Sequence, residues 1–270
     1  MSWVLEPWTY PFMGWALFCC LILAGIHAYL GFHIVRRGIL FVDLAMAQAA
    51  ALGAAFGVVL GVEHDTVEEY MVSVLFALGS AVFFTVARSK RIHQEAIVAT
   101  FYGLAVAATF LVLEHSPHGM EEVKHLFVGQ VLTVSPSHVL LTLALYLAVG
   151  LVLWRMHPRI TAISEGTGSG RLADLLLFTT FALVVTSSVG LVGVLLVFSF
   201  LVIPSVAALC ISTRHASRLA WGWFIAAFSS VIGLYLSFHL DTLAEPTIVL
   251  CLGAALVVAV FAGRARRAKS

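Results

Sequence analysis

The chain has 270 residues, of which 61% are hydrophobic and only 11% are charged. One soluble core of this length would not need so much apolar surface, so the composition excludes an ordinary soluble globular protein. The formal net charge of +1 is uninformative as a sum, because basic and acidic residues fall in separate parts of the sequence. Most of the chain is therefore expected to lie in lipid.

Long runs with almost no charge recur along the whole sequence. A helix needs about 20 apolar residues to span the hydrocarbon layer of a membrane. The predicted fold is thus all-α, a polytopic bundle of about nine spans that forms one transmembrane domain over residues 1–270. Dividing the long apolar segment 172–211 near Gly190 gives nine spans instead of eight. The predicted spans are 12–35, 39–61, 70–88, 96–113, 138–155, 172–189, 191–211, 217–238 and 246–263.

The first apolar run is expected to remain as a span. It is long, has no basic stretch before it and continues directly into Arg36 and Arg37, unlike a cleavable signal peptide. The four cysteines lie inside apolar runs without metal-finger or paired spacing, so we expect them to be packing residues. They are Cys19, Cys20, Cys210 and Cys251.

Positive charges predict the orientation, because cytoplasmic loops of membrane proteins carry an excess of Lys and Arg. With nine spans, Lys124 is the only basic residue that falls on the side opposite the others. The N-terminus is therefore expected outside and the C-terminus in the cytoplasm. The basic residues of the predicted inner side are Arg36, Arg37, Arg88, Lys90, Arg91, Arg155, Arg159, Arg171, Arg214, Arg218, Arg264, Arg266, Arg267 and Lys269.

The predicted outer segments combine carboxylates with imidazoles. Such ligands suit transition metals, and their collective acidity should concentrate cations near the outer face. The alternative is a set of solvated acidic loops with no ligand. The histidines proposed for metal entry are His64, His115, His118, His125 and His239.

Three polar residues inside the predicted spans are candidates for a transport path, since ionisable groups in a membrane are costly. Asp43 lies about six residues beyond Arg37, whereas Gln48 and His27 lie deeper, at similar levels of consecutive helices. For Asp43, the alternative is a structural pair with Arg36 or Arg37. For His27, it is a hydrogen bond to a neighbouring helix. Small residues around Asp43 predict a helix at the centre of the bundle.

Several motifs are absent from the sequence. None of the three lysines follows a glycine in a phosphate-binding loop, and no metalloprotease or hydrolase motif occurs. We therefore expect no enzymatic activity and no ATP binding by this chain itself. The basic residues are explained by orientation, so no nucleic-acid partner is expected.

Four stretches resemble the permease subunits of zinc- and manganese-type ABC importers. They follow the family order over most of the chain: Arg36–Gly53, Glu95–Gly103, Phe127–Pro136 and Gly190–Pro204. The resemblance implies a permease in the cell membrane that carries zinc or manganese, or iron, into the cytoplasm without a resident cofactor. It also implies a homodimer, an ATP-binding subunit on the cytoplasmic face and an extracytoplasmic metal-binding protein. A proton- or sodium-coupled secondary transporter and a non-transporting scaffold are the alternatives.

The same resemblance implies that Asp43 belongs to the metal path. The chain differs from the usual family pattern at two places. The family usually has a histidine four residues after this aspartate, where this chain has Ala47, and Gln48 is the nearest substitute. Either His27 or another helix supplies the imidazole, or transit relies on weaker oxygen ligands. The inner segment His157–Arg171 is short and rich in glycine, whereas the family usually has a longer segment that contacts the ATPase. Ser164, Glu165 and Gly166 are the predicted contact residues.

Overall fold

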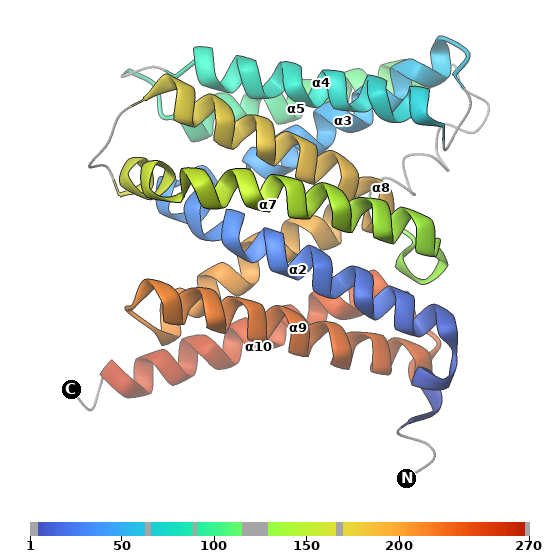
Figure 1. The fold of residues 1–270 in the computed structure, drawn as a ribbon, viewed down its shortest axis with the longest axis vertical. Coiled ribbons are helices and arrows are strands. Elements are labelled where there is room, and N and C mark those ends of the chain that lie inside the picture. Colours follow the sequence, from blue (N-terminus) through green and yellow to red (C-terminus); the bar gives the residue numbers. More distant parts are fainter. Residues whose placement is uncertain (1–4, 63–65, 89–90, 115–128, 166–169, 268–270) are drawn as a thin grey trace. The chain divides into compact units, whose positions relative to one another are not determined.

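The computed structural model describes residues 5–62, 66–88, 91–114, 129–165 and 170–267, and within these ranges it contains helices and no strand (Figure 1). The all-α fold predicted from composition is confirmed. In chain order the elements are η1 (Glu6–Thr9), α2 (Pro11–Arg37), α3 (Val42–Val59), α4 (Val67–Val86), α5 (Gln94–Leu113), η2 (Val131–Thr133), α7 (Pro136–Ser164), α8 (Arg171–Ile211), α9 (His215–Leu240) and α10 (Ala244–Arg267).

The helices form two compact units. The first comprises Met1–Val35, Val128–Tyr146 and Leu191–Ser270, and the second comprises Arg36–Phe127 and Leu147–Gly190. Because their boundaries fall inside α2, α7 and α8, each of these three helices contributes to both units. The candidate residues Asp43 and Gln48 belong to the second unit, and His27 belongs to the first.

Eight helices in the described ranges are long and apolar enough to cross a membrane. The difference from nine predicted spans arises in α8, which runs from Arg171 to Ile211 as one element but is interrupted at Gly193. Gly193 has φ 74° and ψ 162°, a backbone region open essentially only to glycine. The predicted division is therefore present, but it lies at Gly193 instead of Gly190.

Helix α7 is longer than the span predicted at 138–155. It continues to Ser164, so residues 157–164 of the predicted inner segment are helical and the connection to α8 begins at Glu165. Pro158 does not end the helix, and the first glycine comes only after Glu165. The inner loop expected over 157–171 is correspondingly shorter.

Helix α3 is the most buried of the eight candidate spans, with 67% of its apolar window inside the structure. It packs against both α4 and α5 in the second unit (Figure 1). Gly53 permits this approach, because a Cβ there would lie 2.8 Å from the Cα of Ser73 on α4. The small side chains of α3 thus allow close packing of backbones, as their pattern predicted.

In the first unit, α9 packs along α10 (Figure 1). A Cβ on Gly233 would lie 2.6 Å from the Cα of Ile248, so glycine is required for this contact too. The carboxylate of Glu245, near the start of α10, accepts a hydrogen bond from the backbone N–H of Val131. This bond fastens the short helix η2 to α10.

Candidate functional site

Asp43 is a buried carboxylate without a hydrogen-bond partner among the residues that the structure describes. It lies in the first turn of α3, is 1% exposed, and neither Oδ1 nor Oδ2 contacts a donor in the described part of the chain. The structural pair with Arg36 or Arg37 is not formed: Arg36 binds Glu165, and Arg37 binds Asp174 through Nη1, while its buried Nη2 has no partner among the described residues. Two strong acceptors are thus left available to an ion or water.

Gln48 lies about 1.4 turns further along α3 and is 2% exposed. Its amide Nε2 donates a hydrogen bond of 3.2 Å to Oγ1 of Thr109 on α5. The carbonyl oxygen Oε1 has no donor among the described residues. Gln48 therefore has one end of its amide bound and the other available.

His27 is fully buried in α2. Its Nδ1 lies 2.8 Å from the carbonyl oxygen of Leu23, four residues earlier in the same helix, and so donates to it. The ring also stands edge-on to Tyr146 of the same unit, with centroids 6.3 Å apart. Since His27 and Asp43 belong to different units, a shared metal site stays a prediction from the sequence.

The histidines expected at the outer entrance are only partly covered by the structure. His64, His115, His118 and His125 lie outside the described residues. His239 is half-buried near the end of α9 and stacks edge-on against Tyr235, with centroids 4.5 Å apart. Within the described ranges, no group of three or more His, Cys, Asp or Glu side chains is placed to hold a metal ion.

A cluster of charges around the buried Asp174 joins the ends of three helices in the second unit. Asp174, in the first turn of α8, forms an ion pair of 2.7 Å with Arg37 at the end of α2. It forms a second ion pair with Arg88, just after α4. The side chains of Arg37 and Asp174 are 9% and 5% exposed. The cluster therefore fixes where α2 ends relative to α8, immediately before α3 begins.

The residues predicted to contact an ATPase lie beside this cluster. Arg36 donates to Oε1 of Glu165 at 2.8 Å, and Arg37 donates to Oγ of the buried Ser164 at 3.1 Å. Gly166 lies outside the described residues. Ser164 is thus an anchor of α7, whereas Glu165 is partly exposed.

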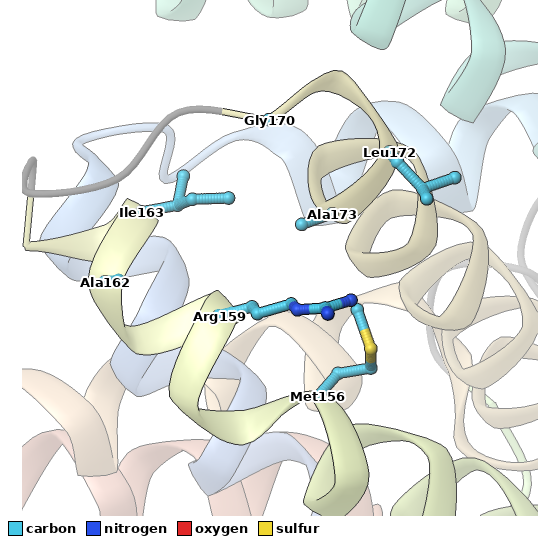
Figure 2. A pocket seen from close by; sticks show the side chains of 7 residues that line it. All are labelled: Met156, Arg159, Ala162, Ile163, Gly170, Leu172 and Ala173. Atoms are coloured by element: carbon cyan, nitrogen blue, oxygen red, sulfur yellow. The ribbon is translucent and has the colours of Figure 1, made fainter.

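A pocket of about 340 Å³ lies between the end of α7 and the start of α8 (Figure 2). Figure 2 shows Arg159 and Met156 among the residues that line it, with the Arg159 side chain extending from α7. The other lining residues are small or apolar: Ala162, Ile163, Gly170, Leu172 and Ala173. This pocket leaves a guanidinium group accessible next to the α7–α8 connection.

Two positioning residues were not identified from the sequence. Glu95 of α5 accepts a 3.2 Å hydrogen bond from the backbone N–H of Phe41, the residue that precedes α3 and has no side-chain cap of its own. Thr109 holds Gln48. Both bonds join residues more than fifty positions apart, so no local sequence signal indicates them.

The comparisons with known proteins agree with this arrangement. The family described as the ABC 3 transport family matches residues 9–263, nearly the entire chain. The chain belongs to this family. It is therefore a multi-pass permease of the cell membrane, the transport subunit of an ABC system in which a separate subunit hydrolyses ATP.

Curated relatives carry metal-transport names. The chelated iron transport system membrane protein YfeC of Yersinia pestis is 24% identical, with 88% of this chain and 82% of YfeC covered. The manganese transport protein MntB of Synechocystis is 23% identical, covering 96% and 85%. The zinc uptake protein ZnuB of Haemophilus influenzae is 25% identical, covering 91% and 95%.

A solved structure shows the same fold. A chain of PsaBC from Streptococcus pneumoniae, in complex with Fab, has a TM-score of 0.80 and 18% identity. The match covers 100% of this chain and 99% of that chain. The architecture of the second unit, with α3 packed between α4 and α5, is thus that of a known membrane protein fold.

Proposed function

We propose that this permease carries a divalent transition metal ion into the cytoplasm. The family membership supports transport, and the names of relatives with similarity over nearly the whole chain refer to iron, manganese and zinc. An ion-coupled secondary transporter is disfavoured, because the family is one of ABC systems. The transported ion is the substrate of the permease and not a resident cofactor.

The observation that carries the proposal is the isolated Asp43 carboxylate. A buried carboxyl group without a partner is unfavourable in a membrane, and the chain retains one in a membrane helix although Arg36 and Arg37 pair with Glu165 and Asp174. A passing divalent cation would offset that cost and lose part of its own hydration to carboxylate oxygens. We assign Asp43 to the path as a transient ligand.

The partners follow from the same proposal. Two copies of the chain would flank the path, an ATP-binding subunit would contact the cytoplasmic face at Glu165 and Gly166, and an extracytoplasmic metal-binding protein would deliver the ion. The accessible Arg159 and the partly exposed Glu165 support a contact for a polar partner near the α7–α8 connection. Co-purification of ATPase activity with this chain tests the cytoplasmic contact. Its absence from an actively importing preparation would refute it.

Asp43→Asn tests the metal path. The amide has nearly the shape of the carboxylate but supplies dipoles without a charge, so uptake per assembled complex should fall by at least tenfold. Assembly should stay intact, because the carboxylate makes no hydrogen bond that the amide would lose. Uptake of radioactive manganese, zinc and iron by cells that express the complete transporter measures the effect.

Uptake must be normalised to assembled complex, since a purely structural aspartate would reduce yield and leave transport per complex unchanged. Glu69→Gln, on α4, is a suitable control for neutralising a buried acid of the same unit. Normal uptake by Asp43→Asn would remove this residue from the path.

A further inference from the structure

The orientation of the Gln48 amide follows from hydrogen-bond chemistry. The Thr109 hydroxyl donates its single proton to the carbonyl oxygen of Ala105, at 2.9 Å. Toward Gln48 its oxygen can then only accept, so the group that faces it must be the N–H-bearing Nε2. Thr109 is 3% exposed, so water does not compete readily for this bond.

The carbonyl oxygen of Gln48 is consequently the end of the amide that remains available. It is buried and accepts no hydrogen bond from any described residue, and leaving a buried polar atom unpaired is unfavourable. Two hydrogen bonds, from Thr109 to Ala105 and from Gln48 to Thr109, thus fix the Gln48 amide. They leave Oε1 of Gln48 on α3 as an acceptor without a donor among the described residues.

Gln48 and Asp43 provide two successive oxygen positions along α3. Five helical residues correspond to a rise of about 7.5 Å and a rotation of about 140°, so the two side chains do not share one coordination shell. All three of their unpartnered atoms are oxygens. The two residues therefore present oxygen ligands at two levels of α3 and on different sides of the helix.

The soft ligands on the packed helices around these oxygens are methionine thioethers, Met46 on α3 and Met71 on α4. The sequences of α3, α4 and α5 include neither histidine nor cysteine. Carboxylate and carbonyl oxygens suit manganese, whereas imidazole nitrogen and thiolate sulfur suit zinc. The composition of this helix group therefore favours an ion that prefers oxygen.

We propose that Gln48 is a specificity-determining ligand, held by Thr109 with its carbonyl oxygen available, and that the permease carries manganese in preference to zinc. This inference rests on the proposed function. Thr109 is a positioning residue, because it acts on the ion only through Gln48. The alternative role of the Gln48–Thr109 bond is to join α3 to α5.

The experiment measures manganese and zinc uptake, alone and in competition, in cells that express the complete transporter. Thr109→Val removes the acceptor and should lower manganese uptake about tenfold, the effect usual for losing a residue that orients a metal ligand, with little change in zinc uptake. Thr109→Ser keeps the hydroxyl and should restore the wild-type ratio. Gln48→His should shift the ratio toward zinc.

Thr100→Val is a matched control on the same helix. The Thr100 hydroxyl also donates to the carbonyl oxygen four residues earlier, at 2.8 Å, but it lies at an exposed site. Its loss should leave both metals unaffected. Assembled complex is quantified for every variant, and Gln48→His still decides the question if Thr109→Val fails to assemble.

Three results have different meanings. A wild-type preference for zinc, or an unchanged ratio in both Thr109→Val and Gln48→His, would overturn the specificity inference and leave metal transport standing. Equal losses of both metals would show that the bond only packs the helices, and would overturn it as well. Wild-type transporter that imports neither manganese, zinc nor iron would instead refute the proposed function.

Discussion

Asp43 and Asp174 are buried aspartates of the same unit, and their surroundings are opposite. Asp174 is 4% exposed and pairs with Arg37 and Arg88, whereas both oxygens of the 1% exposed Asp43 have no described partner. Paired buried charges maintain structure, and an unpaired one needs a functional explanation. Asp174 is therefore a structural carboxylate, whereas Asp43 is a candidate metal ligand.

The contrast predicts that Asp174→Asn destabilises the protein while Asp43→Asn does not. Neutralising Asp174 leaves the largely buried Arg37 without its ionic partner, and breaking a buried pair in this way costs about 3–5 kcal/mol. The yield of assembled transporter and its thermal unfolding midpoint in detergent should both fall. Arg88→Gln is the control with a small effect, because the Arg88 side chain is 56% exposed and the Arg37 pair remains. Wild-type stability of Asp174→Asn would contradict the assigned role.

At the scale of elements, the α7–α8 connection is attached to the end of α2, and α3 follows α2 after a short turn. Arg36 binds Glu165, Arg37 binds Ser164 and Asp174, and Phe41 is held by Glu95. A displacement of the α7–α8 connection would thus be transmitted to the start of α3, where Asp43 lies. This continuity gives the proposed ATPase contact a physical route to the metal path.

Glu165→Gln should uncouple ATP hydrolysis from uptake without unfolding the protein. The Arg36–Glu165 pair is partly exposed, with side chains 24% and 34% accessible, and such pairs contribute only about 0–1 kcal/mol. Metal imported per ATP hydrolysed should fall severalfold in proteoliposomes. The charge-swapped double variant Arg36→Glu/Glu165→Arg should recover part of the loss. Unchanged coupling in Glu165→Gln would place the contact elsewhere, for instance at Arg214–Arg218.

At the scale of the whole molecule, topology depends on whether α8 crosses the membrane once or twice. A helix of 41 residues would be about 60 Å long, twice the hydrocarbon thickness, and its break at Gly193 would permit two crossings. Two crossings keep Arg214 and Arg218 with the other basic residues. One crossing would place them outside, against the usual excess of positive charge in the cytoplasm.

Cysteine labelling from outside the cell distinguishes these topologies. In a background without the four native cysteines, single cysteines at positions 159 and 214 should resist an impermeant reagent, and one at position 68 should react. Labelling after permeabilisation controls for burial. Reaction at 214 with protection at 159 would indicate a single crossing by α8, and protection at 68 with reaction at 159 would invert the orientation.

The sequence alone determined the membrane class, the positions of the apolar helices and the family, because lipid requires long uncharged runs and the motifs lie in order along the chain. It also singled out Asp43 and Gln48 as polar residues inside apolar helices. Only the tertiary structure decided that Asp43 lacks the expected arginine partner and that Thr109 orients Gln48. It also decided that the division of the long apolar segment lies at Gly193. These features depend on contacts between helices and on one backbone conformation, and neither can be predicted from local hydropathy.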